Sequence, residues 1–529
     1  MKAIELFFIS SLTCFSMDIY AQAPIRKLPQ SINRPSVNVT APFISLDGNT
    51  LVFTSDYAED NELTIYYTQK VQANFKEPQV LPKHINNKLN FAGGYTLSAD
   101  GNTIYITTLK SGGVGGFDIW AGNLKGASWG DLQNMFIPIN SALHDGCPTF
   151  TPDGKTMYFM RCTTMNQKKA ENCKIMVANK GANGRWQEPA ELPPNINTGN
   201  SQTPRISSGG EILIFASDAI KPNKGGLDLY ASKFNKGSWS DPEALDFVNT
   251  TKDDQFVSFI ANGRYILKDA PGAYTSEILE YLVPEEWRPP AQMKIEGFIN
   301  NANGAPTPAY ISVIDLTTQE RIFNGRPDKE GGYYLYLKEG NKYELAVDPE
   351  QSNFTYFSKV IDMTGTGSPL TLKINPILNP VEVGDELKLE GIQFKSYTSE
   401  LDRADSEIRR LSRLIKAAPQ FEFEVQVLLA GYEEDSLRTN PDLTEISIDT
   451  VLVQFDEVDS LGLTIARDSM MIERTYHNNR TENQAISILD ALAASGVDPE
   501  ALSYSVNALP EPIAENRRIQ VRVVVHKKE

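Results

Sequence analysis

Histidine and cysteine carry much of the nucleophilic, acid–base and metal chemistry of proteins, and this sequence holds few of either. The chain has 529 residues but only four histidines, which are far apart, at positions 84, 144, 477 and 526. We find no Gly-x-Ser-x-Gly nucleophile elbow, no His-Glu-x-x-His zinc pair and no phosphate-binding loop. We therefore expect a protein that is not an enzyme and that holds no metal ion or other cofactor.

Three of the four cysteines, Cys147, Cys162 and Cys173, lie within one short segment. Cys162 and Cys173 flank the polar stretch 165–172, as they would on two strands joined by a loop. In an oxidising compartment this arrangement favours a disulfide between these two and leaves Cys147 as a free thiol. The alternative is that all three are reduced and buried.

Aspartate recurs beside glycine in a repeated unit whose turn positions are Asp47-Gly48, Asp100-Gly101, Asp153-Gly154, Gly209-Gly210 and Asn262-Gly263. Repeated carboxylates could bind a metal ion, but each copy supplies at most one, so turn chemistry is the better interpretation. Each pair separates two alternating apolar runs, which is a strong hairpin signal. The unit recurs at roughly fifty-residue spacing, within the range of propeller blades.

Two further strands complete each unit. The similar runs at 115–120 and 225–230 predict a third strand, and a fourth, which contains proline and ends in Ile-Asn or Val-Asn, recurs at 77–86, 136–140, 188–197 and 241–249. Another copy at 23–33 precedes the first unit, and the fifth unit has none. The sequence thus predicts a five-bladed β-propeller over residues 24–290, closed by its N-terminal strand. These units resemble the WD-like repeats of TolB-type bacterial propellers, which implies a binding scaffold with a central channel.

Residues 1–23 are typical of an export signal. Lys2 precedes an apolar run over 4–15, and small residues follow near Ala21 and Ala23. The run is too short for a permanent membrane helix, and we expect no transmembrane segment elsewhere. The alternatives are a buried strand and, because of Cys14, a lipidated N-terminus. The net charge of −17 argues against a nucleic-acid partner, which would require a basic face.

After prolines 289 and 290 the pattern changes to short alternating strands at 294–299, 309–315, 332–337 and 342–347. They predict a small β-sandwich over residues 293–375. The Gly304-x-Pro306 turn, the Asp328-x-x-Gly331-x-Tyr333 step and the Gly340-x-x-Tyr343 turn resemble the carboxypeptidase regulatory-like domain. That family is a non-catalytic module, which implies a rigid spacer.

Beyond a linker at 364–380, predicted strands alternate with helices at 399–418 and 482–495. This order predicts an α+β domain over residues 385–529, interrupted by an insertion at 436–476. Three motifs resemble the OmpA-type peptidoglycan-binding domain: Phe394 through Leu401, Gly431-Tyr432-Glu433-Glu434, and Asn516-Arg517-Arg518.

The OmpA resemblance implies a site for the diaminopimelate carboxylate of the peptidoglycan stem, held in the family by an Asp and an Arg. The matching positions here are Glu434 and Gln484, and Arg517 and Arg518 are further sources of charge. Glutamine cannot supply the charged, bidentate fork that arginine offers a carboxylate. We therefore expect a degenerate site with weakened affinity for peptidoglycan.

The expected protein is thus multidomain, with an all-β five-bladed propeller, a small β-sandwich and an α+β OmpA-like C-terminal domain. Together these parts resemble a periplasmic protein of the type nine secretion system, which carries in addition a helical-repeat domain. We expect an exported, outer-membrane-associated scaffold that binds peptidoglycan through its C-terminal domain and envelope or secretion-system proteins through its propeller. The alternative is a propeller that binds a carbohydrate or peptide beside an OmpA-like domain that has lost peptidoglycan binding.

Overall fold

A computed structural model describes residues 25–529, except 58–62, 73, 126–127, 182, 261–262, 273–274, 366–370, 431–443, 445, 459, 478, 509–517 and 529. The expected export signal therefore lies outside the described residues. The chain divides into two compact units, Met1–Gln292 and Met293–Glu529. Of the helices in the described ranges, none combines the length and apolar content needed to cross a membrane.

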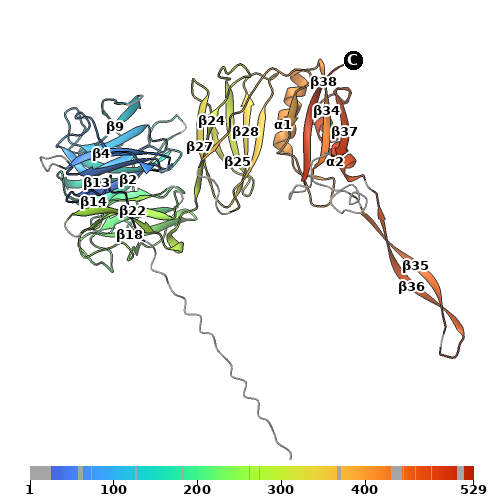
Figure 1. Cartoon of the computed structure of the whole chain (residues 1–529), viewed down its shortest axis with the longest axis horizontal. Coiled ribbons are helices and arrows are strands. Elements are labelled where there is room, and N and C mark those ends of the chain that lie inside the picture. The colour runs from blue at the N-terminus through green and yellow to red at the C-terminus, as the bar shows by residue number, and fades with distance from the viewer. Residues whose placement is uncertain are drawn as a thin grey trace, which may run out of the picture. The chain divides into compact units, whose positions relative to one another are not determined.

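The first unit is a β-propeller of five antiparallel sheets, coloured blue to green in Figure 1. Blade one contains β2 (Val39–Ile44), β3 (Thr50–Ser55), β4 (Thr64–Val71), β5 (Asn74–Phe75) and β6 (Gln79–Val80). Blade two contains β7 (Asn90–Leu97), β8 (Thr103–Thr108), β9 (Asp118–Lys125), β10 (Ser128–Trp129) and β11 (Gln133–Asn134). Blade three contains β12 (His144–Phe150), β13 (Thr156–Met165), β14 (Ala170–Asn179) and β15 (Ala190–Glu191).

The last two blades repeat this order. Blade four contains β16 (Gln202–Ile206), β17 (Ile212–Ser217), β18 (Asp228–Asn235), β19 (Ser238–Trp239) and β20 (Glu243–Ala244). Blade five contains β21 (Val257–Phe259), β22 (Tyr265–Pro271), β23 (Ser276–Leu282) and, from the N-terminus, β1 (Arg26–Lys27). A 3-10 turn, η1 (Glu285–Trp287), ends the unit.

The repeated Asp-Gly pairs form turns between the first two strands of their blades, as predicted. Gly48, Gly101 and Gly154 adopt φ of 72°, 71° and 64°, a region that glycine enters at no steric cost. In the first turn a carboxylate oxygen of Asp47 accepts hydrogen bonds from the Ser45 hydroxyl and from the Asn49 amide, the latter at 3.0 Å. The turn itself therefore uses the carboxylate, in agreement with the turn interpretation.

The predicted outer strands are much shorter than expected, because asparagine side chains replace part of the strand pairing. Each of five asparagines donates to and accepts from the backbone of one third-strand residue, at 2.7–3.0 Å. The pairs are Asn33 with Ile278, Asn86 with Ile65, Asn140 with Ile119, Asn197 with Ile175, and Asn249 with Leu229. We call these five residues the asparagine clamps.

The N-terminal segment closes the ring, as the displaced fourth-strand copy predicted. β1 pairs with β23, with Arg26 opposite Glu280 and Lys27 opposite Leu279. Further along this segment, Leu28 and Ile32 join the core cluster that contains Ile278. Blade five is thus completed by residues that precede blade one.

The second unit begins with two facing sheets. One has the order β27 (Gly332–Lys338), β24 (Gln292–Phe298), β30 (Thr371–Lys373), and the other β26 (Arg321–Gly325), β25 (Ala309–Asp315), β28 (Lys342–Pro349), β29 (Phe357–Asp362). β30 pairs in parallel with β24, so the predicted linker 364–380 contributes a strand. The strand was not predicted, because it is only three residues long and the surrounding proline and glycine residues are typical of a linker.

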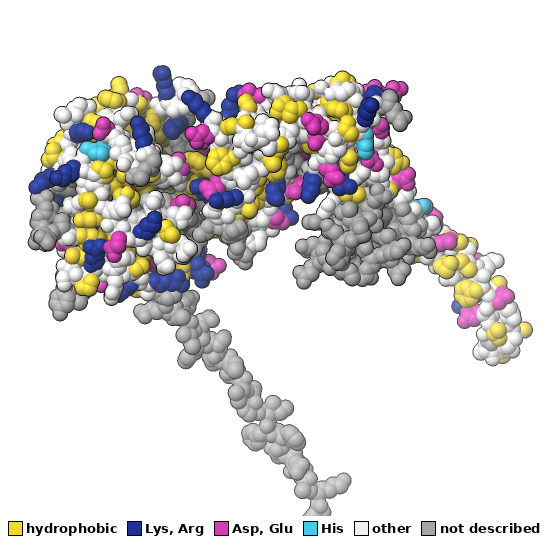
Figure 2. All heavy atoms as spheres, turned by 45° about the horizontal axis from the view of Figure 1, so that its top comes forward, with side chains coloured by type: hydrophobic (Ala, Val, Ile, Leu, Met, Phe, Trp, Pro, Cys, Tyr) yellow, Lys and Arg dark blue, Asp and Glu magenta, His cyan; other side chains and the backbone are white. Residues whose placement is uncertain are grey.

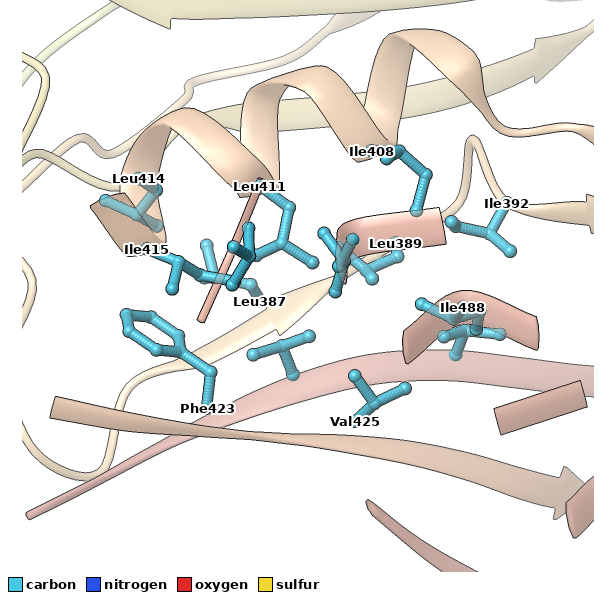
Figure 3. Close-up of a cluster of buried hydrophobic side chains, with 14 of the residues drawn as sticks. Leu387, Leu389, Ile392, Ile408, Leu411, Leu414, Ile415, Phe423, Val425 and Ile488 are labelled. Atoms are coloured by element: carbon cyan, nitrogen blue, oxygen red, sulfur yellow. The ribbon is translucent and has the colours of Figure 1, made fainter. Parts of the chain in front are cut away.

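The C-terminal part is α+β. Its sheet has the order β31 (Glu386–Lys388), β38 (Arg518–Lys527), β34 (Phe421–Ala430), β37 (Leu502–Ala508), and a small pair joins β32 (Gln393–Phe394) to β33 (Leu401–Arg403). α1 (Asp405–Ala417), α2 (Arg480–Ala494) and the turn η3 (Pro499–Ala501) accompany them. Figure 3 shows Ile408, Leu411 and Ile415 of α1 directed toward the sheet residues Phe423 and Val425, in one buried cluster.

Two sequence expectations fail here. The first helix was expected to start at Ser399, but Leu401 lies in β33 and the helix starts at Asp405, because strand pairing overrides helical spacing at its beginning. The strand β37 was not predicted, although it pairs in parallel with β34. The described part of the insertion contains a long hairpin of β35 (Ile446–Val458) and β36 (Thr464–Tyr476).

Helix α1 also packs against the sandwich through buried charges. Arg410 forms an ion pair with Glu344 of β28 and lies 3.6 Å from Asp348, and both Arg410 and Glu344 are buried. The Ser358 hydroxyl of β29 donates to the buried Glu407 carboxylate at 2.8 Å. The sandwich is therefore more than the expected spacer, since it covers one side of α1.

Candidate functional site

The predicted peptidoglycan site can be examined at Gln484, on the second turn of α2. The side chain is only 2% exposed, and its amide nitrogen donates to the Thr398 carbonyl at 3.2 Å. Its carboxamide oxygen is buried without a hydrogen-bond partner among the described residues. A neutral, buried amide thus occupies the position at which the resemblance requires an arginine.

The other predicted residues are placed only in part. Glu434 and Arg517 lie outside the described residues, and Arg518 is the first residue of β38. In the sheet register Arg518 is paired with Ala430, the last residue of β34. The described residues nearest in sequence to Glu434 and Arg517, which are Ala430 and Arg518, are thus partners on neighbouring strands.

One positive charge near this place was missed from the sequence. Arg480 opens α2, four residues before Gln484, so the two side chains occupy the same face of the helix. Arg480 is 3% exposed, and its guanidinium donates to the Thr444 carbonyl at 2.7 Å. The i, i+4 spacing was the signal that could have identified it.

The cysteines lie together in blade three. Cys162 and Cys173 are opposite each other in the register of β13 and β14, with their sulfurs joined at 2.10 Å. Cys147 is a free, fully buried thiol, and burial raises its pKa to about 12. It is therefore protonated near neutral pH, which suppresses thiolate reactivity.

The propeller channel holds a small cavity. The cavity lies at the end of the channel nearest the Asp-Gly turns. Its volume is about 60 Å³. All five blades contribute to its lining, including Phe43, Leu97, Phe150, Arg205 and Phe259. The residues for which the structure gives positions include no group of three His, Cys, Asp or Glu side chains placed to hold a metal ion.

Comparison with known proteins gives weak likenesses only. No protein-family profile matches the sequence, and no curated protein matches it. Solved structures similar in part include TolB from Acinetobacter baumannii, at 15% identity over 46% of this chain and 54% of that one, with a TM-score of 0.31. The chain thus spans about half the length of that protein.

Two further structures are similar at the same level. They are a protein assigned as TolB from Agrobacterium tumefaciens, at 15% identity over 59% of this chain and 96% of that one, TM-score 0.30, and an oligogalacturonate lyase from Vibrio parahaemolyticus, at 11% identity over 51% and 96%, TM-score 0.28. TM-scores this low carry no argument. The description of the first unit as a propeller rests on its strand pairing.

Proposed function

We propose that this protein is an exported, non-enzymatic scaffold of the cell envelope. It binds a partner protein through exposed apolar surface and associates with peptidoglycan through its C-terminal α+β part. The observation that carries the first half of this proposal is the hairpin β35–β36. The second half is supported by the resemblance of sequence motifs in the C-terminal part to the OmpA-type domain.

The hairpin is unusual because apolar side chains are exposed on both of its faces. Its strands pair at thirteen positions, and successive residues point to opposite faces. One face carries Leu452 and Met470, 61% and 75% exposed, and the other carries Phe455 and Met471, 47% and 54% exposed. Figure 2 shows hydrophobic side chains exposed along this hairpin, which we call the arm.

A lone two-stranded hairpin is marginally stable in water, and an extended apolar surface marks a binding site. The arm therefore gains stability when a partner covers it. A photoreactive residue at Leu452 or at Met471 should crosslink in cells to one discrete partner, whereas the same residue at the exposed Lys373 should not. Failure of both arm positions to crosslink would refute the proposed partner binding.

Peptidoglycan association is tested by sedimentation of the full chain with purified peptidoglycan. A charged donor to a carboxylate contributes about 1.5–3 kcal/mol against about 1 for a neutral hydrogen bond, so Gln484→Arg should raise affinity roughly tenfold. Asn483→Arg adds the same charge at the neighbouring, less buried position and should have no effect. If neither the wild type nor Gln484→Arg sediments, the peptidoglycan role is wrong.

A second candidate function is a propeller that binds a peptide or carbohydrate ligand, beside a C-terminal domain without wall affinity. The channel cavity, to which all five blades contribute, favours it. Sedimentation and crosslinking separate the two candidates, because this one requires neither.

A further inference from the structure

Arg205 places a positive charge inside the propeller channel. It lies on β16, the inner strand of blade four, and is 2% exposed. In or directly before each inner strand, a residue with positive φ precedes an equivalent position by two residues. Ala41, Gly93, Cys147, Thr203 and Phe256 precede Phe43, Tyr95, Thr149, Arg205 and Ser258. Among these five equivalent positions, blade four alone carries a charged side chain.

The equivalent residues on other blades are engaged in contacts between blades. The Thr149 hydroxyl accepts from the Ile206 amide at 3.2 Å, and the Ser258 hydroxyl accepts from the Ile44 amide at 2.9 Å. These hydrogen bonds give Thr149 and Ser258 a structural role in joining adjacent blades.

Arg205 is less completely paired. It donates to the carbonyls of Pro204 at 3.1 Å and Tyr95 at 3.3 Å, and its guanidinium lies 5.4 Å from the Phe43 ring centre. Within the part of the chain that the structure describes, its Nε has no hydrogen-bond partner and its guanidinium has no carboxylate in ion-pair contact. A buried charge without a counter-ion is costly, and burial accordingly lowers the pKa of Arg205.

Two of the hydroxyl groups that line the cavity with Arg205 lack a hydrogen-bond partner among the described residues. They belong to Thr96 and Ser208, and the side-chain oxygens of both are buried. The lining contains no Asp or Glu, and the phenylalanines Phe43, Phe150 and Phe259 form apolar wall. Unsatisfied buried polar groups are rare in folded proteins and call for a ligand or water.

We propose that the turn-side mouth of the propeller channel binds a carboxylate, with Arg205 as the counter-charge and Thr96 and Ser208 as hydroxyl donors. An arginine with free donor capacity matches a carboxylate, and the phenylalanines suit an apolar group next to it. The volume of about 60 Å³ admits the carboxylate and its nearest atoms. This carboxylate site specifies the ligand chemistry of the second candidate function and rests on it.

The test is calorimetric titration of the chain 25–529 with acetyl-Gly-Phe as the free acid, the same peptide as its amide, and sodium propionate. The free acid should bind and the amide should bind at least tenfold more weakly. Binding of propionate as tightly as the peptide acid assigns the site to a small organic acid, whereas tighter peptide binding assigns it to a peptide terminus. Absence of binding by both acids, or an equal response to chloride alone, would overturn the proposal.

Two variants locate the binding. Arg205→Met removes the charge and should weaken the free acid at least tenfold, while Arg185→Met, at an exposed position of the same propeller, should leave binding unchanged. Without ligand, Arg205→Met should melt no lower than wild type, since an uncompensated charge has been removed.

A third variant keeps the proposal testable if Arg205→Met fails to fold. Ser208→Ala retains the charge and should still weaken the acid several-fold. Unchanged binding by Ser208→Ala together with a strongly destabilised Arg205→Met would identify Arg205 as a structural anchor instead. The measurement uses no wall material and no partner, so its failure is distinct from failure of the scaffold proposal.

Discussion

At the scale of single residues, the five asparagine clamps show how a side chain can substitute for a strand. A carboxamide presents a donor and an acceptor side by side, which is what an edge-strand residue requires of its neighbour. The Ile-Asn and Val-Asn endings were visible in the sequence as part of a strand. Their role was not, because the sequence does not show which backbone groups each carboxamide contacts.

The clamps lead to a stability prediction. Asn197→Ala leaves the amide and carbonyl of Ile175 without these partners inside the blade, since Asn197 is 6% exposed. A buried polar group left unsatisfied costs about 1–3 kcal/mol, so the propeller should lose at least that much unfolding free energy. Asn235→Ala, at an exposed position of blade four, should change it little. Urea denaturation followed by tryptophan fluorescence measures both, and equal midpoints would refute the clamp.

Glu407 gives a pH-dependent prediction. Burial raises the pKa of this carboxyl, with Arg410 and Ser358 acting in the opposite direction. A carboxyl whose pKa is raised in the folded state contributes most below its unfolded pKa, about 4.3, and this contribution is lost as pH rises through the folded value. Glu407→Gln should therefore gain stability relative to wild type as the pH rises from about 4.3 toward neutrality. Glu400→Gln, at an exposed site where Lys395 lowers the pKa, should show no such gain in parallel thermal melts.

At the scale of elements, the repeat predicted the propeller well because hairpin turns are local. An Asp-Gly pair between alternating runs determines a turn, its hairpin and the face that is buried, all within about a dozen residues. Two strands that pair with partners distant in sequence were not predicted. β37 pairs with β34 across an intervening hairpin and helix, and its alternation of Leu502, Tyr504 and Val506 with polar residues was a strand signal that we missed. β30 is only three residues long and carries no signal of its own.

Ring closure is the prediction that belongs to this scale. A chain that begins at Arg34 lacks β1, Leu28, Ile32 and the clamp Asn33, so it leaves the outer edge of β23 unpaired. It should melt well below a chain that begins at Ile25, because the closing contact between first and last blade is gone. Circular dichroism melts of the two chains provide the comparison. Coincident melting curves would show that closure by this segment adds no stability.

At the scale of the whole molecule, the two parts predicted beyond the propeller share buried contacts within one compact unit. The α+β domain was expected to begin at residue 385 as an independent body. Instead Tyr356 and Val381, which precede it, belong to the same buried cluster as Leu411 and Phe423. Ion pairs between a helix and a strand some sixty residues away leave no pattern in a sequence, so this joint could not be predicted.

The candidate site follows the same division. Gln484 was placed correctly on a helix, because apolar residues at helical spacing identify α2. Its burial against Thr398 depends on how α2 packs on residues distant in sequence. The same holds for Arg480, one turn earlier, which contacts Thr444. The channel position of Arg205 depends on the assembly of five blades, and no single repeat reveals it.

The joint within the second unit can be tested by comparing fragments. Fragment 293–529 retains the sandwich cover of α1, whereas fragment 385–529 exposes Arg410 and Glu407 and loses Tyr356. The shorter fragment should therefore melt lower or aggregate.

Arg410→Ala in the longer fragment should reproduce much of the loss, about 3–5 kcal/mol, because it leaves Glu344 buried without its partner. Arg413→Ala removes the neighbouring ion pair between Arg413 and Asp348. Because the Arg413 side chain is 48% exposed, this loss should cost about 1 kcal/mol or less. If 385–529 is as stable as 293–529, the contact between α1 and β28 contributes nothing to folding, and the two parts are independent domains.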